Sequence, residues 1–121
     1  MPEAPALRRI LVVEDDLDLS DLLAAALLFA GFEPLVARNG REALDLLATG
    51  IRPDLILLDL MMPIMDGREF RKRQCDQPDI AQIPVIICSA EESSTAADLA
   101  AYATFKKPLD FDALIGLLRS V

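Results

Sequence analysis

Residues 54–67, which read DLILLDLMMPIMDG, decide the fold. Within them four apolar residues, Leu55–Leu58, run directly into Asp59, and a second apolar run, Ile10–Val13, leads into the acidic residues 14–16. Short apolar runs bounded by polar residues are typical of strands buried on both faces of a parallel sheet. Ligands bind just past the carboxyl ends of such strands, so we expect these acidic groups to meet in one small site.

The predicted site has an excess of negative charge. Carboxylates that are held close together repel one another unless a cation lies among them, and Asp59, at the tip of a buried strand, is also desolvated. The pattern therefore predicts a divalent metal and an anion that the metal helps to bind. Taken alone, Asp15 and Asp16 fit a helix N-terminus equally well, and Asp66 before Gly67 is interpreted as turn chemistry.

Outward from these runs, strand patterns and helical patterns alternate along the chain. Strands are predicted over Arg9–Val13, Glu33–Ala37, Asp54–Asp59, Pro84–Cys88 and Thr104–Lys106, the second at an edge because it contains Pro34. Helices are predicted over 19–30, from an Asn39 cap to Gly50, near Arg68–Cys75, over Glu91–Ala101, and after an Asp110 cap through Leu118. The alternation indicates an α/β fold: a doubly wound, five-stranded parallel sheet with helices on both faces.

Composition excludes several classes of function. The chain has 121 residues, 53% of them hydrophobic, which fits one compact domain with a sizeable core. A net charge of −8 argues against a nucleic-acid surface, and the longest apolar stretch, Leu22–Ala30, is too short to span a membrane. With no histidine, the chain cannot use a Ser-His-Asp mechanism or a His-ligated zinc. The thiols of Cys75 and Cys88 are expected to be free, which favours a reducing cytoplasm, and no signal peptide is visible.

Two further strand ends carry polar groups. Ser89 follows the fourth strand and Lys107 follows the fifth, although singly they would be interpreted as a helix cap and a solvated charge. Together with acids on the first and third strands, a hydroxyl and an ammonium group can hold the three oxygens of a phosphoryl group. The nucleophile would be a carboxylate oxygen, which would form an acyl phosphate.

These stretches together resemble a known family. The matching segments are 10–16 (ILVVEDD), 37–44 (ARNGREAL), 54–67, 83–90 (IPVIICSA) and Lys107-Pro108. In this order they resemble the receiver domain of two-component response regulators, of the CheY-like superfamily, from about Arg8 to Arg119. The resemblance implies a flavodoxin-like sheet of strand order 2-1-3-4-5. It also implies an N-terminal tail over 1–7 and a receiver domain over 8–121.

The resemblance implies specific roles for the residues at the strand ends. Asp59 matches the phosphoacceptor, which takes a phosphoryl group from a phosphohistidine of a sensor histidine kinase or a histidine phosphotransfer protein. For Mg²⁺, Asp15 matches a direct ligand, Glu14 its neighbour that acts through a water, and the backbone carbonyl of Met61 a third protein ligand, with Asp59 completing the set. Ser89 matches the switch hydroxyl. Lys107 matches the ion-pair partner of the phosphoaspartate, with a cis bond to Pro108, and Asp16 is assigned to capping.

The chain departs from the family pattern just before the lysine. The family usually carries Tyr or Phe at the position of Thr104, and strand alternation predicts that Phe105 points to the opposite side. The segment 89–107 is short by about one helical turn, or about 3.6 residues, and lacks the usual Gly. We therefore expect a truncated or displaced fourth helix, and an atypical form of the surface through which the family contacts downstream proteins and often dimerises.

One other function remains open, and a third is disfavoured by the sequence. The chain could be a phosphorylation-independent interaction module with a receiver fold, a reading favoured by Thr104 and the short segment. A hydrolytic aspartyl-phosphatase would need an acid two residues after its nucleophile, where this chain has Met61. The preferred interpretation is a phosphoacceptor in the cytoplasm, not an enzyme in the ordinary sense, that acts alone or as part of a longer regulator.

Overall fold

The computed structural model describes residues 8–90 and 99–121. In this part of the chain five parallel strands form one sheet in the order β2-β1-β3-β4-β5. The strands are β1 Arg9–Val13, β2 Glu33–Ala37, β3 Leu55–Leu58, β4 Val85–Ser89 and β5 Ala103–Lys106. The predicted strands are confirmed with shifts of one residue at their ends. Pro34 lies in an edge strand, as expected, because β2 pairs only with β1.

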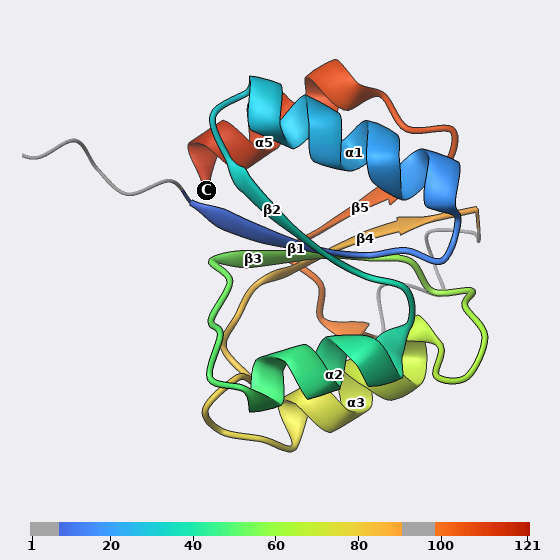
Figure 1. Cartoon of the computed structure of the whole chain (residues 1–121), viewed down its shortest axis with the longest axis vertical. Helices are drawn as coiled ribbons and strands as arrows, with labels where there is room; N and C mark the ends of the chain where they lie inside the picture. Colours follow the sequence, from blue (N-terminus) through green and yellow to red (C-terminus); the bar gives the residue numbers. More distant parts are fainter. Residues whose placement is uncertain (1–7, 91–98) are drawn as a thin grey trace, which may run out of the picture.

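Helices cover both faces of the sheet (Figure 1). Helices α1 Leu17–Phe29 and α5 Phe111–Ser120 lie on one face, and α2 Gly40–Ala48 and α3 Gly67–Cys75 lie on the other. Each face has its own apolar core, because alternate residues of each buried strand point to opposite sides. Ile10 and Val12 join the core beneath α1 and α5, whereas Leu11 and Val13 join the core beneath α2 and α3. Within the described residues no helix is long and apolar enough to cross a membrane.

The helix starts follow capping residues that can be read from the sequence. Asp16 accepts a hydrogen bond from the Leu19 backbone N–H at 3.2 Å, and Asn39 accepts one from that of Glu42 at 2.9 Å, so both predicted caps are confirmed. Asp66, interpreted as a turn residue, caps α3 instead by accepting a bond from the Glu69 backbone N–H at 2.9 Å. The turn therefore ends directly in a helix.

The predicted helix over Glu91–Ala101 falls mostly on residues 91–98, which are outside the described residues. The described end of this range is not α-helical, because Ala100 has a positive φ of 52°. Arg71 of α3 donates hydrogen bonds to the carbonyl oxygens of Leu99 at 2.9 Å and Ala100 at 3.1 Å. A buried guanidinium group thus holds the backbone that leads into β5.

The alternation expected in β5 is confirmed. Thr104 is exposed, whereas Phe105 is partly buried and packs against the core beneath α1 and α5. The aromatic ring therefore lies on the opposite side of the strand from the position where the family usually carries one.

Candidate functional site

The register of β1 and β3 brings two acids together. Val13 pairs with Leu58, so Glu14 and Asp59 follow side by side at the carboxyl end of the sheet. The backbone fixes both positions, because the Glu14 N–H donates to the Ala37 carbonyl and the Asp59 N–H donates to that of Val13, each at 3.0 Å. Both residues are almost completely buried, with exposed fractions of 3% for Glu14 and 5% for Asp59.

Three carboxylates can reach a common point. One oxygen each from Glu14, Asp15 and Asp59 lies within 4.8 Å of the others, and the Asp15 side chain is exposed at the mouth of the cluster. Hard carboxylate oxygens in such a group fit a divalent cation of the Mg²⁺ or Ca²⁺ type, which prefers oxygen ligands. The acidic cluster can therefore hold a metal ion.

Lys107 supplies the positive charge at this cluster. Its Nζ lies 2.7 Å from Glu14 Oε1 and 3.5 Å from Asp59 Oδ1, so its shorter contact is with Glu14 rather than with Asp59. The backbone places it there, because the Lys107 N–H donates to the Ser89 carbonyl at 2.9 Å, just past the paired ends of β4 and β5. The expected cis peptide bond to Pro108 is present.

The cluster has three carboxylates and one ammonium group, and burial strengthens the imbalance. Burial raises the pKa of Asp59 to about 7, the neighbouring Glu14 charge adds to the rise, and Lys107 opposes it. Burial by itself lowers the pKa of Lys107, but the hydrogen bond that its ammonium group donates to Glu14 and the two carboxylate charges raise the pKa above its usual value. The ammonium group therefore stays charged, while burial and the Glu14 charge disfavour the ionised form of Asp59.

The other predicted site residues lie around this cluster. Ser89 ends β4 and is buried beside the chain that carries Lys107. The Met61 backbone N–H donates a hydrogen bond to Asp59 Oδ1, with 3.4 Å between nitrogen and oxygen. The backbone of Met61, whose carbonyl is an expected metal ligand, therefore lies next to the Asp59 carboxylate. Asp16 turns away to cap α1, and its own N–H donates to Glu14 Oε2 at 3.1 Å.

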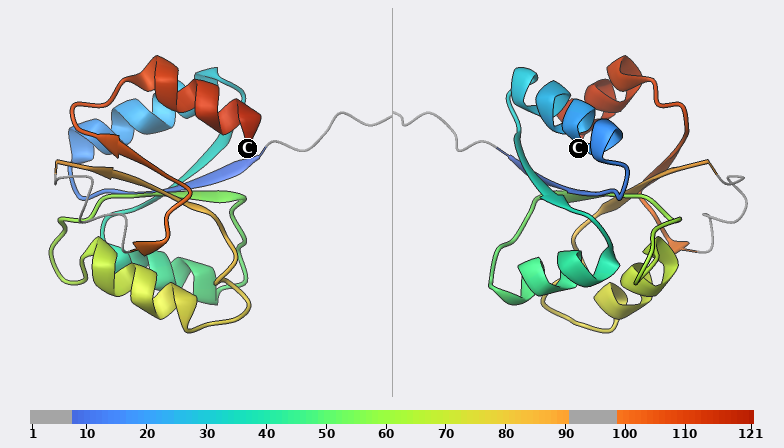
Figure 2. Two further views of the ribbon diagram at one scale, coloured as in Figure 1. Left: turned by 180° about the vertical axis from the view of Figure 1, so that it is seen from behind. Right: turned by 45° about the vertical axis from the view of Figure 1, so that its right-hand side comes forward.

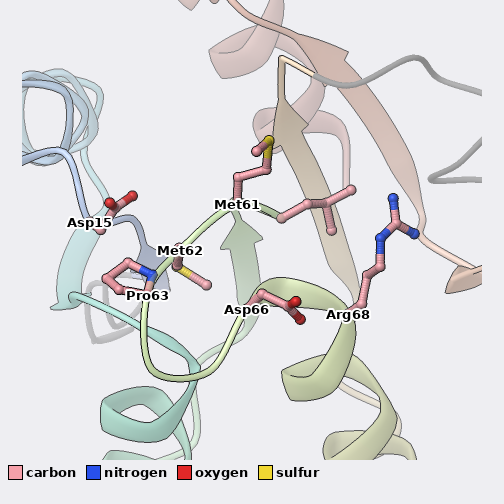
Figure 3. Close-up of a pocket in the computed structure, with 7 residues that line it drawn as sticks. Asp15, Met61, Met62, Pro63, Asp66 and Arg68 are labelled. Atoms are coloured by element: carbon pink, nitrogen blue, oxygen red, sulfur yellow. The ribbon is translucent and has the colours of Figure 1, made fainter.

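A cavity of about 480 Å³ opens beside the acids (Figure 3). Its wall includes Asp15, the 60–63 loop, Asp66 and Arg68. Figure 3 shows Asp15 and Arg68 on opposite sides of the loop that follows β3. The carboxylate side would suit a metal and the guanidinium side an anion. Reasoning from the sequence missed Arg68, although its signal was a cation immediately after the Asp66-Gly67 pair.

Gly67 is a second residue that reasoning from the sequence missed. A Cβ at this position would lie 2.3 Å from the Asp59 carbonyl oxygen and 2.8 Å from the Leu60 Cα. The Gly67 N–H also donates to the Leu60 carbonyl at 2.9 Å. Only glycine therefore lets the start of α3 pack directly against the backbone that carries Asp59, which fixes the acid at the floor of the site.

The sequence of this chain is similar to those of known proteins. Residues 10–119 match the response regulator receiver domain family. The response regulator MprA of Mycolicibacterium vanbaalenii is 35% identical over 117 residues, which cover 93% of this chain and 49% of MprA. The chain thus spans about half the length of that relative.

Solved structures agree with the sequence match. The receiver domain of a signal transduction histidine kinase from Syntrophus aciditrophicus has a TM-score of 0.86 and 32% identity, over 93% of this chain and 88% of that one. The response regulator TrrA of Thermotoga maritima, in complex with Mg²⁺ and BeF, has a TM-score of 0.82 and 30% identity, over 94% and 98%. Both alignments cover more than nine tenths of this chain, so the similarity extends over nearly the whole fold.

Proposed function

Since the chain belongs to the response regulator receiver domain family, we propose that Asp59 accepts a phosphoryl group from a phosphohistidine of a partner protein. The donor would be a sensor histidine kinase or a histidine phosphotransfer protein, because this chain has no histidine of its own. The observation that carries the proposal is the position of the Asp59 carboxylate, which is buried at the carboxyl end of the sheet beside Glu14 and Asp15 and lies 3.5 Å from Lys107 Nζ.

Mg²⁺ is the cation that the site would take. Asp15 and Asp59 would bind it directly, Glu14 through a water, and the backbone carbonyl of Met61 as a further ligand. The donor set supports this assignment, since the three carboxylates lie within 4.8 Å of one another and Mg²⁺ accepts few protein ligands besides waters. When bound, the ion would neutralise charge that develops on the phosphoryl oxygens. The related TrrA was solved with Mg²⁺ and BeF, which is consistent with this assignment.

The chain's own residues would then carry the transfer. An Asp59 oxygen forms a bond to phosphorus while the bond from phosphorus to the partner's imidazole nitrogen breaks, and the leaving imidazole keeps that electron pair. Lys107, 3.5 Å from Asp59 Oδ1, would pair with the added negative charge, and the Ser89 hydroxyl would donate to a phosphoryl oxygen. The product is an acyl phosphate on the protein, so the chain acts as a phosphoacceptor rather than as an enzyme that turns over a substrate.

Phosphorylation would change the surface that a downstream protein binds. Moving Ser89 and Lys107 toward the phosphoryl group would pull on β4, β5 and the start of α5, and a downstream protein would recognise the altered face. We assign this role to a receiver domain over 8–121, preceded by a tail over 1–7, acting in the cytoplasm and without contact to nucleic acid or membrane.

The proposal is tested by incubating the chain with a small phosphodonor and Mg²⁺. One acid-stable, base-labile phosphoryl adduct is expected on the wild type, and none on Asp59→Asn. Asp54→Asn is the matched control, because Asp54 lies at the opposite end of the same strand and should keep the adduct. An adduct that survives in Asp59→Asn would refute the assignment.

One observation favours a phosphorylation-independent interaction module as the second candidate. Thr104 is exposed and Phe105 points into the core, so the aromatic side chain that the family couples to the switch hydroxyl is missing. A downstream partner that binds wild type and Asp59→Ala with equal affinity, with and without phosphodonor, would favour this second function. A loss of phosphodonor-dependent binding in Asp59→Ala would favour the first.

A further inference from the structure

The buried face of α3 carries two polar side chains. Arg71 is 8% exposed and Gln74 is 0% exposed, although residues on the buried face of a helix are normally apolar. Burial removes the donors and acceptors of both side chains from water, which costs free energy unless other groups replace the water. Burial of this pair therefore depends on the hydrogen bonds that it makes within the protein.

Arg71 holds the backbone that leads into β5. Its Nε donates to the Leu99 carbonyl at 2.9 Å, its Nη2 to that of Ala100 at 3.1 Å, and its Nη1 to Gln74 Oε1 at 2.9 Å. Both views in Figure 2 show the orange segment before β5 beside α3. Ala100 has a φ of 52°, which is unfavourable for alanine, so the guanidinium group holds a strained turn.

Gln74 makes the equivalent contacts at the entrance to β4. Its Nε2 donates to the carbonyl oxygens of Ile80 at 2.9 Å and Ile83 at 3.0 Å, and β4 begins two residues later at Val85. Because Gln74 also accepts a hydrogen bond from Arg71, the pair ties α3 to the chain that enters two neighbouring strands. These are the strands that end beside the acidic cluster.

Strand β5 depends on such a contact more than the central strands do. It lies at the edge of the sheet, and Thr104 and Lys106 on one of its faces are exposed, whereas β3 and β4 are buried along their whole length. Only Ala103 and Phe105 pack against a core, that beneath α1 and α5. Few buried residues therefore specify the register of β5. The bonds from Arg71 fix the start of the strand on the side of α3.

We propose that Arg71 is a positioning residue for Lys107: by fixing the start of β5, it determines where the ammonium group lies relative to the acidic cluster. The strand contains only four residues, Ala103–Lys106, and Lys107 follows it directly. A displacement at the start of so short an extended segment moves its end as well. The consequence for phosphoryl transfer rests on the proposed function, whereas the position of the ammonium group does not.

The first test measures how fast the Lys107 amine of the 121-residue chain reacts with a pulse of acetyl N-hydroxysuccinimide ester. Exposed Lys72 is the internal reference. The Lys107 side chain is 22% exposed and ion-paired, so it should be labelled slowly in the wild type. Arg71→Met should raise its rate relative to Lys72 by about fivefold or more, because β5 is released locally. Arg73→Met is the matched control, since Arg73 is exposed on the same helix.

Leu47→Ala distinguishes a local effect from a general loss of stability. Leu47 is buried in α2, which packs over β1 and β2, at the opposite edge of the sheet from β5. Lys107 labelling should stay near the wild-type rate in this variant. If Arg71→Met does not fold, Arg71→Lys gives the same comparison with a smaller rise, because an ammonium group lacks the planar fork. Labelling that Arg71 substitution leaves unchanged, or that Leu47→Ala raises equally, would overturn the proposal.

A double-variant cycle tests whether Arg71 acts through Lys107. With acetyl phosphate and Mg²⁺, Arg71→Met should slow adduct formation on Asp59 by about threefold in the wild-type background. It should cause no further slowing in a Lys107→Met background, where the ammonium group is already gone. Equal slowing in both backgrounds, or none in the wild type, would overturn the proposal. A wild type that forms no adduct would refute the proposed function, while the labelling rates would still decide the position of Lys107.

Discussion

The two ends of the sheet carry similar numbers of charged side chains but use them differently. At the amino end, Arg9 pairs with Glu33 at 3.2 Å and Arg52 pairs with Asp79 at 2.7 Å, and all four side chains are substantially exposed. At the carboxyl end, Lys107 is the counter-charge for a group of three carboxylates, two of which are buried. The charges at the amino end are paired and exposed to water, whereas those at the carboxyl end have an excess of negative charge and are largely buried.

The difference shows which kind of charge indicates a binding site. Exposed ion pairs contribute little to stability and interact mainly with water, so they need no ligand. Buried carboxylates in excess raise the free energy of the folded state until a proton or a cation joins them, and the raised pKa of Asp59 is a sign of that imbalance. Acidic residues alone are not informative, but buried and unmatched ones are.

The largest expected difference is in the reactivity of the two free cysteines, one exposed and one buried. Cys88 is buried near the carboxyl end of β4, and burial raises its pKa to about 12, whereas Cys75 is exposed at the C-terminus of α3. At pH 8 the Cys88 thiol is therefore protonated and shielded from solvent. Cys75 should react with iodoacetamide much faster than Cys88, and Cys88 should become reactive when urea unfolds the chain. Mass spectrometry of labelled peptides measures both rates, and comparable rates would contradict the burial of this strand end.

Gly67→Ala should cause the largest loss of stability among the substitutions considered. The new methyl group would lie 2.3 Å from the Asp59 carbonyl oxygen, so α3 must move away from the carboxyl end, at about 3 kcal/mol. Gly116→Ala is the control, because that position has open space in the middle of a helix and should gain about 0.5–1 kcal/mol. Urea denaturation at low protein concentration measures both, and a neutral Gly67→Ala would show that the close approach is not required.

Replacing one cation at each end compares the two kinds of ion pair directly. Lys107→Met leaves buried Glu14 and Asp59 without their ammonium partner and should lower the free energy of unfolding by about 2 kcal/mol in metal-free buffer. Arg9→Met breaks an exposed pair with Glu33 and should change it by less than about 1 kcal/mol. Chemical denaturation in EDTA gives both values. Equal losses would remove the distinction between the two ends.

The sequence predicted the strands and their acidic ends well, because strands buried on both faces leave a plain apolar pattern and the register of a parallel sheet then aligns their ends. It could not predict that Lys107 lies closer to Glu14 than to Asp59, since that depends on side-chain distances across three strands. The steric role of Gly67 was also hidden, because glycine before a helix looks the same in a turn. Arg68 and Arg71 were missed for a related reason: a charged residue on a short helix is normally solvated.

We predict that the excess negative charge at the carboxyl end forms a site for a divalent cation. This prediction can be tested by titrating metal-free protein with MgCl₂ while recording the melting temperature. The wild type and Asp54→Asn should be stabilised by several degrees and Asp59→Asn by clearly less. The wild-type effect should be larger at pH 8 than at pH 6, because protons compete with Mg²⁺ for a carboxyl group whose pKa is about 7. The prediction would be contradicted if Mg²⁺ did not change the melting temperature of the wild type, or if it raised that of Asp59→Asn by as much.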